Sequence, residues 1–388
     1  MPYLFVGAGQ AGCAIVDAVF DHQRIAQLAT PVAINSTIRD LQNLSNVDRD
    51  AWYGVASGEG LVPGTVPGFE EQVTGGFGRD PRAAADAVAD AGPELRDAFA
   101  EQYGEDAPPF AFVFLGLGGG TGCGIAPRVA EAVKSFGGPS TDVIAVGVLP
   151  NTAGSTTDGD DASAVRQAEN TVYGLDRLED AVDGVVLVDN QRLAYEDAAE
   201  GRFSEYNEYV AAAIVDLISG PVLERIDPSS YEDLDAPVID LQDVVTSLTL
   251  SDGGPGYATL GRSVTMTKSM LGYLLPFVGN ETVDGATLSR LAVSKRSVAD
   301  IAPDDAIKAI GQVRAPARYI TDDSYRIEVS MIRGLLDSYC PEVNIGMTLT
   351  ERNLASFTTL LTFEREDVSR IQELEEIADR ATRAEASP

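Results

Sequence analysis

The chain has 388 residues, 44% of them apolar, so it is long enough for two domains and too apolar for a disordered chain. It contains no apolar run of the ~18 residues that a membrane span needs, and its three cysteines (Cys13, Cys123 and Cys340) lack the spacing of a disulfide framework or zinc site. Acidic residues outnumber basic ones by 60 to 28, and the net charge of −32 disfavours nucleic acid as a partner.

The excess of acidic residues also predicts that the protein depends on salt. The acidic residues are spread over the whole chain, which is typical of a surface adapted to high salt, as in halophiles. We therefore expect structure or assembly to be lost at low salt.

No basic segment precedes the strand-like Tyr3–Val6, so we expect no secretory signal and a cytoplasmic location.

The first predicted unit is a strand at Tyr3–Gly7, a glycine loop and a helix at Cys13–Asp21. The loop, Gly7 to Gly12, matches G-x-G-x-x-G, which by itself is a weak signal for phosphate binding. A dinucleotide-binding fold would also place Asp or Glu at the end of the second strand to hold a ribose. The second predicted strand, Pro31–Ile34, is followed instead by Asn35-Ser36-Thr37, so the motif favours phosphate over NAD.

The most informative stretch follows the predicted strand Phe110–Leu115. It has five glycines in the seven residues from Gly118 to Gly124, and a predicted helix, Ile125–Phe136, comes next. Glycines let backbone N–H groups approach a ligand closely, and a helix N-terminus adds positive potential at the same place. The combination predicts a phosphate site.

Strands and helices alternate through the rest of the first half. Helical sequence is predicted at Pro81–Tyr103, with a break near Gly92-Pro93, and at Ala162–Ala181; strands are predicted at Val143–Leu149 and Gly184–Val188. Such alternation predicts a parallel sheet with helices on both faces. Because ligands lie at the carboxyl ends of such strands, where the polar loops fall, we expect these loops to form one site.

The second half has a different pattern. A long apolar helix is predicted at Ser204–Ile226, where Gly220-Pro221 would kink or end it, and the acidic loop Asp227–Pro237 is the expected boundary. Strands at Val343–Leu349 and Leu354–Phe363 and a closing helix at Glu366–Ala384 indicate an α+β domain. We expect the closing helix to dock on the body, because its polar face is too acidic for a membrane anchor.

Three motifs coincide: Gly9-Gln10-Ala11-Gly12, Gly118-Gly119-Gly120-Thr121-Gly122, and Asp240-x-x-Asp243 beyond the long helix. In this order and spacing they resemble the tubulin/FtsZ superfamily over essentially the whole chain, and the acidic composition is most similar to its haloarchaeal CetZ branch. The resemblance implies an α/β nucleotide-binding domain (1–203), a central helix and connector (204–236) and a smaller α+β domain (237–388). It also implies binding of GTP or GDP with one Mg²⁺ ion.

The resemblance assigns roles to individual residues. The phosphates would lie against Gly9, Gln10, Ala11, Gly12, Cys13 and Ala14, against Asn35, against the γ-phosphate-sensing loop Gly76, Phe77, Gly78 and Arg79, and against Gly118, Gly119, Gly120, Thr121, Gly122 and Cys123. Gln10 would also lie near the metal. Asp160 or Asp161 would meet the ribose, and Asn190 and Asn207 would read the guanine edge, since an amide both donates and accepts. From the residues alone, Asn190 could equally be a turn residue, Asn207 a satisfied polar residue, and the two cysteines packing residues.

Asp240 and Asp243 are the catalytic candidates. The resemblance implies that they reach the nucleotide of the next subunit in a head-to-tail homopolymer and orient a water molecule or a cation. The alternative is that they cap the predicted helix Leu241–Leu248. Where FtsZ proteins carry Asn and Arg, this chain has Val238 and Ala164, so we expect slow hydrolysis.

The resemblance implies a GTP-hydrolysing, filament-forming cytoskeletal protein that acts in cell shape and contacts membranes only through adaptors. Three alternatives remain: an FtsZ-type division protein, a nucleotide-regulated adaptor without hydrolysis, and an NAD-dependent dehydrogenase.

Overall fold

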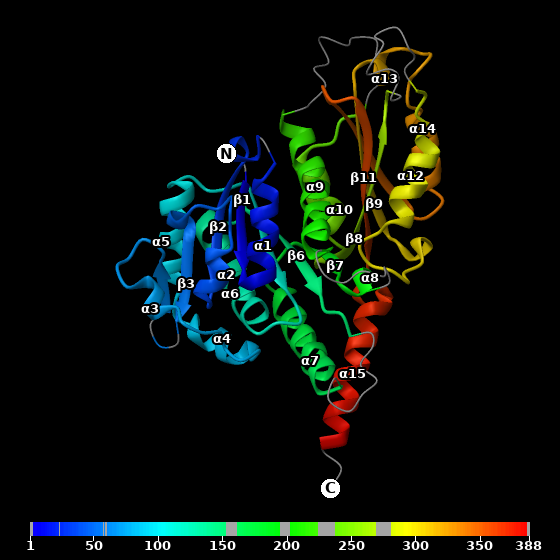
Figure 1. The fold of residues 1–388 in the computed structure, drawn as a ribbon. Coiled ribbons are helices and arrows are strands. Elements are labelled where there is room, and N and C mark those ends of the chain that lie inside the picture. The colour runs from blue at the N-terminus through cyan, green and yellow to red at the C-terminus, as the bar shows by residue number, and fades with distance from the viewer. Residues whose placement is uncertain are drawn as a thin grey trace.

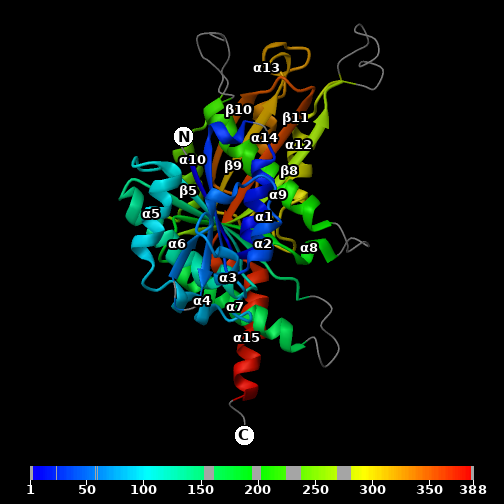
Figure 2. The same ribbon diagram turned by 60° about the vertical axis from the view of Figure 1, so that its left-hand side comes forward.

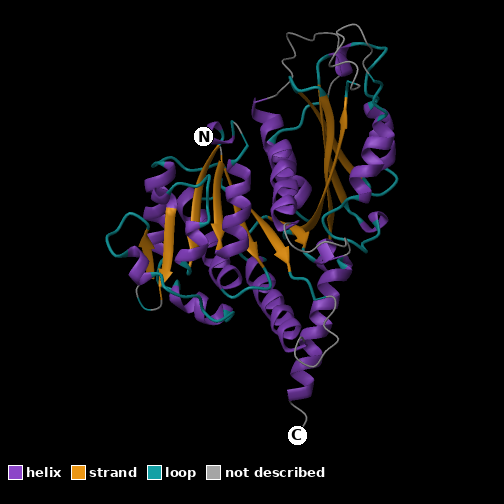
Figure 3. Ribbon diagram, in the orientation of Figure 1, coloured by secondary structure: helices purple, strands orange, loops and turns teal. Residues whose placement is uncertain are grey.

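A computed structural model describes residues 3–22, 24–56, 58, 60–152, 161–194, 202–223, 237–268 and 281–385. One 11-stranded sheet runs through both halves in the order β10-β9-β11-β8-β7-β6-β5-β1-β2-β3-β4 (Figures 1 and 3). Its central strands are β1 (Tyr3–Ala8), β2 (Ala29–Asn35), β5 (Phe110–Gly116), β6 (Asp142–Leu149) and β7 (Gly184–Asp189). They pair in parallel, which confirms the predicted parallel sheet.

The sheet has a hydrophobic core on each face. On β1, Leu4 and Val6 belong to one core and Tyr3 and Phe5 to the other, as the alternation of side chains along a strand requires. The first core is completed by α4 (Pro81–Ala87), α5 (Gly92–Tyr103), α6 (Thr121–Gly137) and α7 (Asp161–Leu178). The second is completed by α1 (Gly9–Phe20), α2 (Ile38–Gln42), α3 (Phe69–Gln72), α9 (Arg202–Leu223) and α10 (Leu241–Leu248).

Several element boundaries differ from the prediction. The break near Gly92-Pro93 is confirmed, because α4 ends at Ala87 and α5 begins at Gly92. Helices α1 and α6 begin four residues earlier than predicted, within the glycine loops themselves. Gly220-Pro221 does not end α9, which continues to Leu223; a proline in the last turn removes only one helical hydrogen bond.

Two strands close the outer edge of the first half. β3 (Trp52–Ala56) pairs in parallel with β2, and β4 (Gly60–Pro63) pairs antiparallel with β3. The sequence predicts alternating strands and helices in this glycine- and proline-rich stretch but gives no bounds for these two strands. Short edge strands of this kind depend on their neighbours more than on their own propensity.

The second half continues the same sheet (Figure 2). β8 (Gly256–Met266) pairs in parallel with β7 and antiparallel with β11 (Leu354–Phe363), and β9 (Lys308–Ala315) and β10 (Glu342–Leu349) complete it. Helices α12 (Gly285–Ser294), α13 (Arg318–Thr321) and α14 (Val329–Leu336) accompany these strands, as an α+β arrangement requires. Of the predicted connector, residues 224–236 lie outside the described part, and the division at 203 and 236 stays a prediction.

The closing helix α15 (Ser369–Glu385) lies along α7 and extends away from the sheet (Figures 1 and 2). The sequence predicts one apolar stripe along it, made of Val368, Ile371, Leu374, Ile377 and Ala381. The first three are buried and the last two are half-buried, so the helix docks through the N-terminal part of the stripe. It begins three residues later than predicted because Arg365–Asp367 forms a 3₁₀ turn. Among the described helices, none combines the length and apolarity needed to cross a membrane.

Candidate functional site

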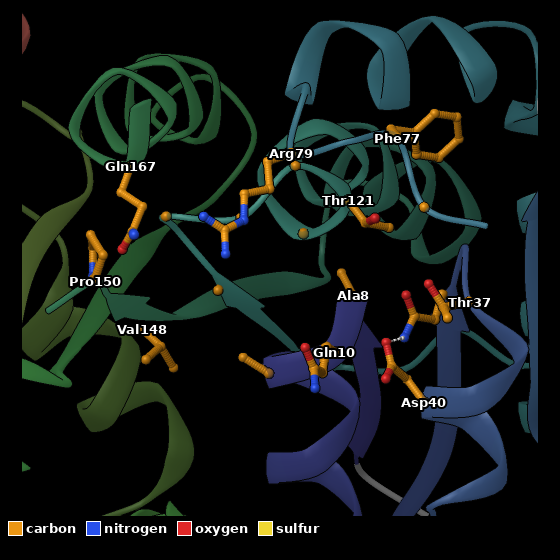
Figure 4. A pocket seen from close by; sticks show the side chains of 18 of the residues that line it. Ala8, Gln10, Thr37, Asp40, Phe77, Arg79, Thr121, Val148, Pro150 and Gln167 are labelled. Carbon is orange, nitrogen blue, oxygen red and sulfur yellow. Dashed lines mark hydrogen bonds between the residues drawn. The ribbon is translucent and has the colours of Figure 1, made fainter. Parts of the chain in front are cut away.

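A cavity of about 490 Å³ opens at the carboxyl ends of the central strands (Figure 4). This volume is within the range of small-molecule sites, roughly 300 to 1,000 Å³. Predicted site residues that line it are Gln10, Ala11, Asn35, Gly76, Phe77, Gly78, Arg79, Gly118, Gly119, Gly120, Thr121, Gly122 and Asn190. Polar loops that the sequence separates by up to 180 residues therefore lie around one space, as expected from the parallel sheet.

The two glycine loops touch each other. Gly9 has a φ of +72°, and a Cβ atom added to it would lie 2.7 Å from the backbone nitrogen of Gly122. A Cβ atom on Gly120 would likewise come within 2.7 Å of the Arg79 backbone. Glycine is required at both positions, because no side chain fits between the converging backbones.

Two helices begin at the cavity, α1 at Gly9 and α6 at Thr121. Their N-cap residues, Ala8 and Gly120, make no side-chain capping hydrogen bond. The first N–H groups of a helix lack intrahelical partners and carry partial positive charge. The arrangement suits an anionic ligand such as a phosphate.

Polar contacts join the end of β2 to the glycine loop of α6. The hydroxyl groups of Ser36 and Thr121 lie 2.7 Å apart. The Asn35 side chain accepts a hydrogen bond from the Ser36 N–H at 2.8 Å. It also donates a hydrogen bond to Asp40 at 3.3 Å, the dashed line beside Asp40 in Figure 4. Asn35 is thus held in a fixed orientation at the cavity wall.

Arg79 and Asp40 are the charged residues among those that line the cavity. Arg79 has a φ of 64°, a strained conformation for a residue other than glycine, and its Nη1 donates to Ser163 Oγ on α7 at 3.0 Å. The buried Asn170 of α7 donates from Nδ2 to the carbonyl oxygens of Arg79 at 3.0 Å and Gly118 at 3.3 Å. One amide therefore holds the Gly76–Arg79 loop and the glycine loop of α6 in place.

The sequence prediction missed several residues of this wall: Thr37, Asp40, Pro150, Asn151 and Gln167 line the cavity, and Asn170 supports it. A usable signal existed for Gln167 and Asn170, which are three residues apart and so share one face of the predicted helix. For Pro150 and Asn151, the signal was their place directly after a buried strand.

Other predicted residues do not line the cavity. Gly12 packs on β5, where a Cβ atom would lie 2.0 Å from the Phe114 carbonyl oxygen, and Gly9, Ala14 and Asn207 are outside the lining. The thiol of Cys13 donates to the Gly7 carbonyl oxygen at 3.4 Å, and that of Cys123 donates to the Leu117 carbonyl oxygen. Burial raises the pKa of both thiols, as expected for packing residues.

The ribose candidate Asp160 lies outside the described residues. Asp161 is the first residue of α7, so the choice between the two stays a prediction.

Asp240 and Asp243 form a capping box at the start of α10. Asp240 Oδ1 accepts from the Asp243 N–H at 3.0 Å, and Asp243 Oδ2 accepts from the Asp240 N–H at 2.8 Å. The capping alternative is therefore realised, and neither residue lines the cavity of its own chain. The described residues hold no cluster of three or more His, Cys, Asp or Glu that could bind a metal ion.

Comparison with known proteins gives a consistent picture. The family model "Tubulin/FtsZ family, GTPase domain" matches residues 3–196. Cell division protein FtsZ 1 of Pyrococcus abyssi is 30% identical over 228 residues, which are 57% of this chain and 52% of that protein. The chain thus spans about half the length of the curated relatives it matches.

Solved structures share the fold. CetZ1 of Haloferax volcanii, described as a GDP-bound monomer, aligns with a TM-score of 0.71 and 21% identity over 98% of this chain and 100% of its own. CetZ2 of the same organism, described as a GTPγS-bound protofilament, aligns with the same score, identity and coverage. At this identity the likeness establishes the fold alone.

Proposed function

The chain belongs to the tubulin/FtsZ family, and from that premise we propose that it binds GTP, forms head-to-tail filaments and hydrolyses GTP between neighbouring copies. One observation carries the proposal: two glycine loops, each opening an uncapped helix, converge on one cavity of about 490 Å³. Asn190 lines the same cavity, and its amide can both donate to and accept from a guanine edge. The nucleotide states of the two CetZ structures agree with this proposal.

In this proposal the backbone N–H groups of Gly118 to Gly122 and of Gln10 hold the phosphates, and Arg79 neutralises part of their charge. The Asp40 carboxylate, the Thr121 hydroxyl and the Gln10 amide supply the oxygen ligands that Mg²⁺ prefers. When bound, the ion would offset phosphate charge during transfer. Phosphoryl transfer requires mainly positioning and charge stabilisation, which such a site can provide.

The hydrolytic half of the site would come from a second copy. A head-to-tail contact is heterologous and extends without closing, so it produces filaments. It would present Asp240 and Asp243 of one copy to the cavity of the next, where they orient a water molecule or a cation. The exposed Val238 contributes no polar group there, so turnover would be slow.

In the cell, we assign this protein to control of cell shape in the cytoplasm of a high-salt organism, with membranes reached through adaptors. The net charge of −32 supports the salt adaptation. The role in cell shape rests on the resemblance of the acidic composition to the CetZ branch, and a role in division stays the alternative, since both FtsZ 1 and CetZ proteins are among the relatives.

The test uses the full chain in about 2 M KCl, a salt concentration that screens its charge. We expect binding of GTP and GDP but not ATP or NAD, light scattering that appears on adding GTP, and turnover that rises more than linearly with protein concentration. Binding of NAD without GTP would favour the dehydrogenase alternative. GTP binding without turnover would favour the adaptor.

A further inference from the structure

Arg370, in the first turn of α15, has a buried guanidinium group whose side chain is only 4% exposed. Its Nη2 donates to the Pro150 carbonyl oxygen at 2.7 Å and to Thr152 Oγ1 at 2.9 Å. Its Nε lies 3.6 Å from Asp189 Oδ2, and its Nη1 lies 2.5 Å from Glu373 Oε2. Burying a charge is costly unless it is paired and hydrogen-bonded. Here Nη1 and Nη2 are hydrogen-bonded, whereas the buried Nε has the Asp189 carboxylate as a nearby counter-charge but no hydrogen-bond partner.

These contacts fall on two segments of the cavity wall. Pro150 and Asn151 follow β6 and line the cavity, and Asn190 follows Asp189 at the end of β7 and also lines it. The two segments are joined directly by the Asn190 N–H, which donates to the Leu149 carbonyl oxygen at 3.1 Å. Arg370 therefore reaches the wall of the cavity from a helix 220 residues further along the chain.

We propose that Arg370 is a positioning residue for the nucleotide site, and that through it α15 sets the geometry of the Pro150–Thr152 and Asp189–Asn190 segments. This inference rests on the proposed function, because it concerns how the same cavity holds its nucleotide. Arg370 does not contact the cavity itself. It acts on nucleotide affinity by fixing the segments that carry Asn151 and Asn190.

The electrostatic setting of Asp189 supports this role. Burial raises the pKa of Asp189 to about 6, and the nearby Arg370 opposes that rise. The other charged or titratable groups that face it are Glu373 of α15, Arg192 of α8 (Gln191–Ala194), Tyr206 of α9 and Asp300 across a cavity of about 120 Å³. Without Arg370, an ionised Asp189 would lack its main counter-charge and both segments would shift.

The test separates positioning from folding. In Arg370→Met the buried Asp189 loses its partner, so a loss of stability is expected; adding Asp189→Asn removes the unpaired charge and should restore the melting temperature. The contacts to Pro150 and Thr152 stay absent in the double variant. We therefore expect its affinity for a fluorescent GDP analogue to remain lower by roughly tenfold or more, as happens when positioning groups move. Hydrogen exchange near residues 150–152 and 190 should be faster in the nucleotide-free protein.

Arg380→Gln is the matched control, because this arginine lies on the same helix with a side chain that is 71% exposed. The variant should change neither the affinity for the GDP analogue nor the hydrogen exchange. A folded double variant that binds the analogue within twofold of wild type and shows unchanged exchange would overturn the inference alone. Wild-type protein that binds no guanine nucleotide would overturn the proposed function and this inference together.

Discussion

The hydroxyl groups of Ser36 and Thr121 lie 2.7 Å apart and join the end of β2 to the start of α6 across the end of β1. Ser36 is fully buried, so its hydroxyl depends on this partner. The contact fixes the glycine loop of α6 relative to the end of β2, where Asn35 lies. One polar pair therefore ties a proposed phosphate loop to the neighbouring wall of the cavity.

Thr121→Val keeps the shape of the side chain but leaves the buried Ser36 hydroxyl without its partner. We expect a loss of about 1–3 kcal/mol in the free energy of unfolding, measured by denaturant titration at fixed KCl, together with weaker GTP binding. Thr121→Ser retains the hydroxyl and should resemble wild type in both measurements. Equal behaviour of the Val and Ser variants would show that the pair has no such role.

Arg79 allows charge and backbone strain to be separated. Arg79→Ala and Arg79→Gly both remove the positive charge from the cavity and should weaken GTP binding to a similar degree, roughly tenfold or more for a charged group on a phosphate. Because the φ of residue 79 is 64°, the Gly variant should be more stable than the Ala variant by about 1 kcal/mol. Unchanged GTP affinity in both variants would contradict the role given to Arg79.

The capping box changes how the role of Asp240 must be tested. Asp240→Ala removes an N-cap and should destabilise the protein by about 1 kcal/mol, which would obscure an effect on turnover. Asp240→Asn keeps a capping side chain and removes the charge, so it should fold as wild type, bind GTP normally, hydrolyse it more slowly and give longer filaments. If Asp240→Asn turns over GTP at the wild-type rate, this residue is not catalytic.

Salt should stabilise the protein strongly. At low ionic strength the acidic side chains that give the net charge of −32 repel one another across the molecule. At 2 M KCl the Debye length falls to a few ångström, so this repulsion is screened. We expect the melting temperature to rise steadily from about 0.1 M to 2 M KCl, with sucrose as a control for general solute effects. A flat profile would contradict the assignment of the acidic surface to salt adaptation.

The pH dependence follows from Asp189. Its pKa is raised from 3.8 to about 6, so the folded state disfavours the ionised form. The stability associated with the protonated group is complete below about pH 4 and is lost as pH rises through 6, by a free energy on the order of 3 kcal/mol. Asp189→Asn should lack this loss, so its stability relative to wild type should be greater at pH 7.5 than at pH 4, as denaturation at constant KCl would measure.

Local physics accounts for what the sequence predicted correctly. Buried strands such as Phe110–Leu115 have an apolar run bounded here by Pro109 and Gly116, and Gly92-Pro93 interrupts a helical stretch whatever surrounds it. Once the strands are known to be parallel, their carboxyl ends must meet, and that argument alone brings Gln10, Asn35, Thr121 and Asn190 to one cavity. Strands β8 and β9 were missed because mixed polar and apolar strands owe their pairing to their neighbours.

The sequence by itself thus determined the parallel sheet, the glycine loops and the edge of the sheet at which polar groups gather, because each depends on residues close together in the chain. Only the tertiary structure decided that Asn170 joins Arg79 to the glycine loop of α6, that Asp240 and Asp243 cap a helix, and that Arg370 reaches the cavity wall from α15. Those contacts depend on how distant helices pack, and no local propensity or spacing encodes the position of one helix against another.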